Sequence, residues 1–195
     1  MATLFVDKID PQSGTSLEIG SSGDTISVPS GATINLSNAT QTGVGGINTP
    51  AFEATLSSNT GYVTNNTYVK VQFNSEIFDV GSAYDSTSNY RFTPQTAGKY
   101  FIYGSVRGNA NANSNLRNMY ISIYKNGSQY KESRINYAGT AIREVNIDVA
   151  ANMIFNGSSD YVELYAAIDD DSGNNQGYFT GGLNITYFGA YKIIE

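Results

Sequence analysis

The sequence predicts an all-β protein in two parts: a short N-terminal β-repeat shaft, residues 1–46, and a C-terminal antiparallel jelly-roll sandwich, residues 47–195. Three observations predict it. The first part repeats short apolar triplets between turns, whereas the second is dense in segments that alternate apolar and polar residues. The second part is also rich in Tyr and Phe, which suit half-buried strands. A chain of 195 residues is long enough for one well-packed domain and a small appendage.

The N-terminal part contains three apolar–polar–apolar triplets, Leu17–Ile19, Ile26–Val28 and Ile34–Leu36. The segments Gly20–Asp24 and Pro29–Gly31 between them are typical of tight turns. Each triplet is too short to bury its apolar face within one chain, but three chains around a common axis would bury it. We therefore expect a homotrimer. The alternative is that this N-terminal segment is a flexible polar leader whose Ile and Val residues are incidental. The residues expected to pack between chains are Leu17, Ile19, Ile26, Val28, Ile34 and Leu36.

The alternation of apolar and polar residues in the C-terminal part predicts eight to ten strands and almost no helix. Tyr68–Phe73 alternates with period two, and Asn118–Lys125 does the same before Lys125–Ser128, whose Asn-Gly pair is typical of a hairpin turn. The other expected strands are Ala51–Leu56, Lys99–Val106, Gln129–Tyr137, Arg143–Val149, Tyr161–Ile168 and Gly177 through Tyr191.

One segment is ambiguous between helix and strand. Ile142, Val145, Val149 and Met153 would also lie on one face of a helix. Because Val145, Ile147 and Val149 alternate and the neighbouring segments are strands, we interpret it as a strand.

The composition argues against several classes of function. Charged residues make up 14% of the chain, its net charge is -6 and its eleven basic residues are scattered, which argues against a nucleic-acid partner. With no Cys and no His, thiolate–imidazole zinc sites, thiol nucleophiles and Ser-His-Asp triads are excluded. No stretch approaches the roughly 20 apolar residues of a membrane span, so no membrane insertion is expected. A surface of amides and hydroxyls is common on extracellular adhesive proteins and virus particles.

A spaced set of residues in the second part resembles the signature of the C1q-like globular heads. Seven positions carry it: Phe73, Asp79, Tyr84, Phe92, Gly98, Tyr100 and Ile102. The resemblance covers about Ala51 to Ile194 and departs from the family by one extra residue before Phe92 and by Ile102 and Gly104 in place of aromatic residues. It implies a trimeric jelly roll used for binding, with Tyr187 and Tyr191 of the last strands packed at the trimer centre.

The stretch from Val6 through Thr40 is similar to N-terminal segments of phage fibre proteins, notably those of marine bacteriophages and cyanophages. The similarity rests on Asp7–Gly14 and on Gly23–Ile34. It implies that the N-terminal segment docks onto other virion proteins and that the C-terminal head faces the host. We accordingly expect a protein that is made in the host cytoplasm and located on the phage particle, and the first residues show no signal-peptide pattern.

Two polar loops, 108–115 and 170–177, are the candidate receptor-facing surface, because loops on a rigid sandwich often carry binding. The alternative is a plain solvated connection. The candidate residues are Asn109, Asn111, Asn113, Asn115, Asp169, Asp170, Asp171, Asn174 and Asn175. The acidic run could also bind calcium, as some C1q-like heads do, but it lacks the spacing of the familiar calcium loop, so no cofactor is expected.

The expected function is non-enzymatic, since no pair of carboxylates stands out as an acid–base pair. The chain is interpreted as a trimeric phage fibre or appendage whose head attaches to a host-surface glycan or receptor. The main alternative is a capsid decoration, cement or connector protein with a purely structural role. A secreted C1q-like lectin and a small carbohydrate-cleaving enzyme are the remaining hypotheses.

Overall fold

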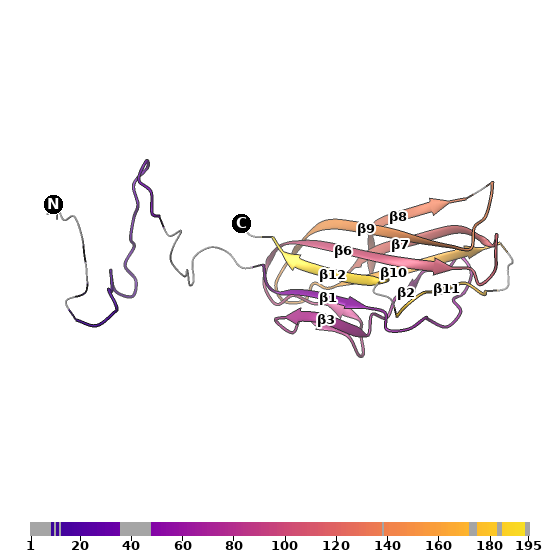
Figure 1. Cartoon of the computed structure of the whole chain (residues 1–195), viewed down its shortest axis with the longest axis horizontal. Helices are drawn as coiled ribbons and strands as arrows, with labels where there is room; N and C mark the ends of the chain where they lie inside the picture. Colours follow the sequence, from indigo (N-terminus) through magenta and orange to yellow (C-terminus); the bar gives the residue numbers. More distant parts are fainter. Residues whose placement is uncertain are drawn as a thin grey trace. The chain divides into compact units, whose positions relative to one another are not determined.

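The structure is a computed structural model that describes residues 9, 11, 13–35, 48–137, 139–171, 175–182 and 185–193 (Figure 1). Contacts divide the chain into two units, Met1–Val44 and Gly45–Glu195, which are described separately below. The domain boundary predicted between residues 46 and 47 lies outside the described residues.

The second unit, which we call the head, is built from β-strands. The strands within the described residues are β1 (Ala51–Thr55), β2 (Val69–Lys70), β3 (Ser75–Val80), β4 (Tyr84–Asp85), β5 (Arg91–Phe92), β6 (Gly98–Asn109), β7 (Leu116–Lys125), β8 (Ser128–Asn136), β9 (Glu144–Phe155), β10 (Val162–Asp170), β11 (Tyr178–Phe179) and β12 (Tyr187–Lys192). No helix is assigned in the described part of the chain, and therefore none with the length and apolar character needed to cross a bilayer.

The strands form two antiparallel sheets packed face to face. In sheet A the order is β3-β1-β12-β6-β9, and β11 pairs with the end of β6. In sheet B the order is β4-β5-β10-β7-β8, and β2 pairs with β10. Sequential neighbours in the chain often lie in different sheets, as expected for a jelly roll. The predicted all-β sandwich is therefore confirmed.

The core lies between the sheets and is rich in aromatic rings. Phe52 stacks on Tyr84 with ring centroids 4.3 Å apart, lies 4.8 Å from Phe92 and meets Phe188 edge-on at 5.1 Å. Each fully buried Phe contributes about 1.5–3 kcal/mol of transfer free energy. Core residues recur at every second position from Met119 to Ile123 on β7, from Val162 to Ile168 on β10 and at Phe188 and Ala190 on β12, which is the period that the sequence shows.

The C1q-like signature consists mostly of core residues. Phe73, Tyr84, Phe92, Tyr100 and Ile102 are all buried in the single hydrophobic cluster. The Asp79 carboxylate accepts hydrogen bonds from the backbone N–H groups of Ala83 and Tyr84, each 3.1 Å long, and so fixes the turn that leads into β4. The residues of this signature therefore form part of the core and fix one turn.

Several local predictions are confirmed and two need correction. Asn126 and Gly127, with φ of 51° and 77°, close the predicted β7–β8 hairpin, and the ambiguous segment is strand β9. The strand expected over Tyr68–Phe73 is shortened to Val69–Lys70, and the segment expected from Gly177 through Tyr191 contains two strands, β11 and β12. Strand β3, with apolar side chains on an edge, was not predicted.

In the N-terminal unit the two predicted turns are present. Asp24 donates its backbone N–H to the Ser21 carbonyl over 2.9 Å, and Ala32 does the same to the Pro29 carbonyl over 3.1 Å. Residues 13–35 contain no strand, and their apolar side chains from Leu17 to Ile34 are exposed. Leu36 lies outside the described residues. The predicted packing needs neighbouring chains, so it stays a prediction.

Candidate functional site

The two ends of the head differ in what they carry. The chain enters the sandwich just before β1, beside the end of β12, where Lys192 donates its backbone N–H to the Asn48 carbonyl over 3.3 Å. Strand β6 starts at this end and runs over 12 residues to Asn109, roughly 36 Å from its first residue to its last at about 3.3 Å per residue. The opposite end, which we call the distal end, gathers residues 56–66, 110–115, 171 and 175–177 (Figure 1).

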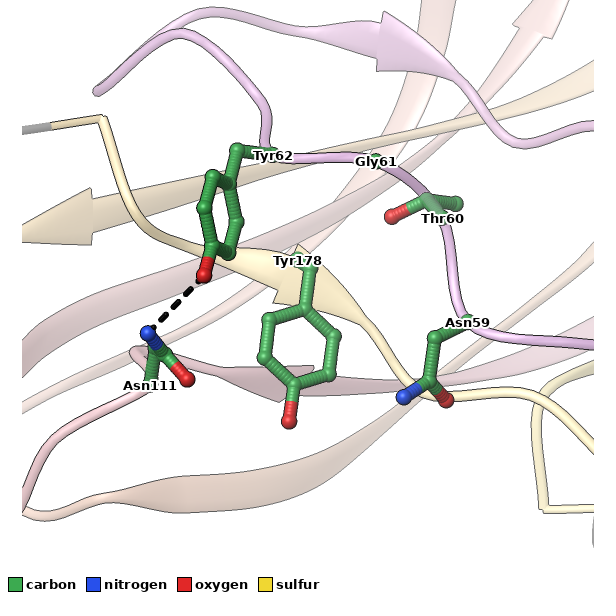
Figure 2. A pocket seen from close by; sticks show the side chains of 6 residues that line it. All are labelled: Asn59, Thr60, Gly61, Tyr62, Asn111 and Tyr178. Atoms are coloured by element: carbon green, nitrogen blue, oxygen red, sulfur yellow. Dashed lines mark hydrogen bonds between the residues drawn. The ribbon is translucent and has the colours of Figure 1, made fainter.

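A pocket of about 390 Å³ opens at the distal end. It is lined by Asn59, Thr60, Gly61, Tyr62, Asn111 and Tyr178 (Figure 2). The rings of Tyr62 and Tyr178 have centroids 6.3 Å apart and planes tilted by 44°. Tyr62 is 61% exposed. We call this site the tyrosine pocket.

Backbone pairing holds the two tyrosines in place. The segment before Tyr62 runs along β11: Thr60 donates its N–H to the Phe179 carbonyl over 3.0 Å, and Phe179 returns an N–H to Thr60 Oγ1 over 2.8 Å. One residue beyond Tyr62, the N–H of Val63 donates to the Gly177 carbonyl over 2.8 Å. The rings therefore stand on paired backbone, which lowers the entropic cost of ordering them around a ligand.

Asn111 closes the pocket from a third segment. Its backbone has φ of 58°, a left-handed conformation that Asn tolerates. Asn109 Oδ1 accepts the Asn111 backbone N–H over 2.8 Å, and Asn109 Nδ2 donates to the Glu144 carboxylate over 3.0 Å. Positioned in this way, Asn111 Nδ2 donates to the Tyr62 hydroxyl over 3.0 Å, as Figure 2 shows.

The predicted receptor-facing residues fall into different environments. Asn111, Asn113, Asp171 and Asn175 are exposed, and Asn115 and Asp169 are half-buried. Asn109 and Asp170 are buried, with 4% and 2% exposure, which corrects the expectation that they face a receptor. Asn109 fixes Asn111, and the Asp170 backbone N–H donates to Asn65 Oδ1 over 2.5 Å, so both residues hold loops. Asn174 lies outside the described residues.

The carboxylates of the acidic run Asp169–Asp171 contact other residues of the same head. Asp171 forms an ion pair of 2.5 Å with Arg117, Asp169 accepts a hydrogen bond from Asn118 Nδ2, and Asp170 accepts the N–H of Gln176 over 3.3 Å. Among the described residues no group of three or more acidic side chains is arranged to hold a metal ion. Residues 172–174 lie outside that description.

The outer side of sheet A carries a second candidate surface, the aromatic face. It consists of Phe78, Val80, Phe101, Tyr103, Tyr187 and Tyr191 on β3, β6 and β12. Phe101 lies 5.6 Å from Tyr191 and 5.9 Å from Tyr103, and Tyr103 lies 6.2 Å from Tyr187, all between ring centroids. Tyr191, one of two residues predicted for trimer packing in the head, is 39% exposed in the single chain.

Two neighbours shape the aromatic face. The Glu53 carboxylate accepts a hydrogen bond of 2.7 Å from the Tyr103 hydroxyl, and burial together with this carboxylate raises the pKa of Tyr103. Gly189 lies opposite Tyr103 on β12, and a Cβ there would overlap the Tyr103 ring. Gly189 thus lets the ring lie flat across the strand.

Sequence reasoning found part of each surface. Asn111 of the tyrosine pocket and Tyr187 and Tyr191 of the aromatic face were predicted. Tyr62 and Tyr178 were not assigned to a binding site, although Tyr62 follows the turn-like run Asn59–Gly61. A tyrosine directly after a polar, Gly-containing loop is the signal that could have found it.

Comparison with known proteins reveals a shared fold. No protein-family model matches the sequence, and no curated protein matches it either. Solved structures do match: the globular domain of zebrafish complement 1qA (TM-score 0.51, 11% identity, 74% of this chain and 97% of that one) and murine APRIL at pH 5.0 (0.51, 9%, 73% and 98%). Eiger TNF from S. frugiperda is similar as well (0.52, 10%, 73% and 91%). The head is therefore an antiparallel jelly roll with the C1q/TNF-like fold.

Proposed function

We propose that the chain is a non-enzymatic phage virion protein, a trimeric fibre or appendage whose head attaches to a host-surface glycan or receptor. The N-terminal segment would dock onto other virion proteins, as the similarity of Val6 through Thr40 to phage fibre segments implies. The fold supports a binding role only in general terms, so the proposal depends on two surfaces of the head.

The aromatic face is the observation that carries the proposal. Monomeric proteins rarely leave a contiguous patch of large apolar side chains in water, because each one forfeits transfer free energy. Phe78, Val80 and Tyr191 are all exposed in the single chain. We propose that a second copy covers this face, and that the ring closes at three chains, as the C1q-like resemblance implies. The exposed apolar triplets of residues 17–35 would be covered by the same assembly.

The distal end supports the attachment role. It lies across the head from the point where the chain enters from the N-terminal segment. If the N-terminal segment docks onto the particle, the entry end of each head is tethered and the tyrosine pocket is free to meet the host. Three pockets on one axis would convert weak contacts into lasting attachment, because the second and third binding events are intramolecular.

The experiment has two measurements on the purified full chain. Native mass measurement is expected to give three chains, and pre-incubating host cells with the protein is expected to reduce phage adsorption. A monomer with an ordered N-terminal region would contradict the trimer. A trimer that labels the capsid in electron microscopy and leaves adsorption unchanged would establish the decoration or connector role instead.

The non-enzymatic part of the proposal has its own measurement. Incubating the protein with host surface polysaccharide is expected to release no reducing sugar over the same period in which a known depolymerase does so. Released sugar would identify the chain as a carbohydrate-cleaving enzyme.

A further inference from the structure

We propose that the tyrosine pocket binds an uncharged saccharide, one or two pyranose rings of a larger glycan. This inference rests on the proposed attachment function and names its ligand class and site. A volume of about 390 Å³ lies at the lower end of the range of about 300–1,000 Å³ that is typical of small-molecule sites. The walls come from three segments that the fold brings together: residues 59–62, Asn111 and Tyr178.

The aromatic rings provide the apolar part of the site. A pyranose has faces of C–H groups and a rim of hydroxyls, so it packs well on a flat ring that is surrounded by hydrogen-bonding groups. Tyr62 and Tyr178 are tilted by 44° to each other, and a sugar lying on one ring would meet the other with its edge. Tyrosine offers this contact area at a low cost in side-chain entropy.

The polar groups provide the rim. Asn59 Oδ1 accepts the Gly181 backbone N–H over 3.0 Å, which leaves the Asn59 amide N–H groups to donate to a ligand. Asn111 Nδ2 uses one N–H on the Tyr62 hydroxyl, so its second N–H and its carbonyl oxygen can meet a sugar hydroxyl. These are fixed donors and acceptors beside an apolar floor, as a polyhydroxylated ligand requires.

The charge of the site selects among ligands. All six lining residues are uncharged. An acidic sugar or a phosphate would need Lys or Arg in the wall, and a nucleic acid would need a basic track on a chain whose net charge is -6. A purely apolar ligand would cover the exposed amides of Asn59 and Asn111 without giving them hydrogen-bond partners. The neutral saccharide is the ligand class that matches both rings and amides.

The test uses the full-length protein and methyl glycosides of glucose, galactose, N-acetylglucosamine and N-acetylgalactosamine as probes, with glucuronic and N-acetylneuraminic acid as anionic counterparts. Backbone amide resonances are followed during titration. At least one neutral glycoside is expected to bind in the millimolar range and to shift residues 59–62, Asn111 and Tyr178, with weaker effects from the acids. If no neutral glycoside shifts these residues, the inference is wrong.

Substitutions of the lining residues test whether the glycoside binds in the tyrosine pocket. Tyr62→Ala and Tyr178→Ala are each expected to weaken binding at least about tenfold, because each removes one aromatic platform. Asn111→Gly keeps the left-handed backbone and removes the amide, and it is expected to weaken binding several-fold. Since Tyr62 is exposed, Tyr62→Ala leaves the core intact even if Tyr178→Ala disturbs β11.

The matched control is Tyr130→Ala. Tyr130 is 52% exposed on β8, and its hydroxyl donates to the Asn152 carbonyl over 3.2 Å, so it resembles Tyr62 in being an exposed tyrosine with one hydrogen bond at its hydroxyl. Glycoside affinity is expected to stay unchanged in this variant. Equal affinity of Tyr62→Ala and Tyr130→Ala would contradict the pocket site.

Adsorption assays separate the two proposals. If the unmodified protein blocks phage adsorption and Tyr62→Ala blocks it equally well, attachment stands and the tyrosine pocket is not its site. If the protein binds a glycoside in the pocket but does not affect adsorption, the saccharide site stands and the attachment function is wrong.

Discussion

The outer faces of the two sheets are both rich in aromatic residues, but the charged groups that contact the rings differ. The aromatic face of sheet A has one carboxylate, Glu53, within it, and that carboxylate accepts the Tyr103 hydroxyl. On sheet B the rings of Tyr68, Tyr120, Tyr124 and Tyr165 form a comparable cluster, with Tyr124 and Tyr165 stacked at 4.1 Å.

Charged groups run through the cluster on sheet B. Lys70 and Glu163 form an ion pair of 2.6 Å, and the Tyr68 hydroxyl donates to Glu132 over 2.6 Å. Burial, followed by this hydrogen bond, raises the pKa of Tyr68. Covering this face with another chain would strip water from several charges, which costs free energy that the pairs do not fully return. Tyrosine content alone therefore does not mark an interface. We propose that the charges between the rings distinguish the face that a second copy covers from the face that stays in water.

The largest expected effect comes from placing a charge on each face. In Tyr191→Asp, assembly would bury an unpaired carboxylate among aromatic rings, at a cost of several kcal/mol per chain. We expect the native mass to fall from three chains to one. In Tyr120→Asp the new carboxylate stays in water on sheet B, and we expect three chains. Loss of assembly in Tyr120→Asp alone would reverse the assignment of the two faces.

Strand β12 carries one aromatic ring in the core, Phe188, and its neighbour Tyr187 on the aromatic face, so the two sides of sheet A can be compared. Phe188→Ala removes a fully buried ring that contacts Phe52 and Phe73, and should lower the free energy of unfolding by about 3–5 kcal/mol. That corresponds to roughly 10 °C in Tm for a domain of this size. Tyr187→Ala should lower Tm mainly at low protein concentration, since it weakens association. Thermal unfolding over a range of protein concentrations distinguishes the two responses, and a concentration-independent loss in Tyr187→Ala would contradict an interface role.

Most of the sandwich could be predicted because its pattern is local. Alternation along β6, β7 and β10 reports which side chains point inward, and Asn126-Gly127 specifies its hairpin by backbone preference. Strand β3 escaped prediction because Ile77, Phe78 and Val80 are apolar on a solvent-exposed edge, where alternation with polar residues would be expected.

The sites could be predicted only in part, because they depend on contacts between distant segments. Asn109 and Asn111 lie in the same polar run, but one is buried and the other lines the tyrosine pocket. The difference arises from a left-handed turn at Asn111 and from Glu144 on another strand. Likewise, Tyr62 and Tyr178 come together only because the segment before Tyr62 pairs with β11. No periodicity within a loop encodes such neighbours.

A smaller effect is expected from adding one methyl group to each surface. In Gly189→Ala the Cβ would overlap the Tyr103 ring, so the ring must move out of the aromatic face, at a cost of about 1–3 kcal/mol. Gly61→Ala in the tyrosine pocket is the control, because a Cβ there meets nothing within 4 Å. Thermal unfolding and native mass are expected to change for Gly189→Ala alone. Equal stability of the two variants would show that the aromatic face tolerates displacement of Tyr103.

The smallest effect is expected at low pH, for a loop of sheet B that is held by a carboxylate. Asp85 is the last residue of β4 in sheet B, and its carboxylate accepts the backbone N–H groups of Ser88, Thr87 and Asn89 over 2.9–3.0 Å. These bonds, that from Ser88 most of all, hold the pKa of Asp85 well below its usual range. The ionised form is therefore favoured in the folded state, so its contribution is complete above the unfolded pKa of about 4 and is lost as pH falls through the folded pKa.

The measurement compares the unmodified protein with Asp85→Asn in thermal unfolding between about pH 7 and pH 2. The unmodified protein should be the more stable at pH 7. The difference should shrink below about pH 4, because there Asp85 takes up a proton in the unfolded chain, whereas the Asp85→Asn side chain does not titrate. Subtracting the two curves removes the titration of the other carboxylates that the proteins share. A constant difference across this range would mean that the loop after β4 is held by its backbone geometry and not by the carboxylate charge. In that case the charge of Asp85 would contribute little to the stability of this loop.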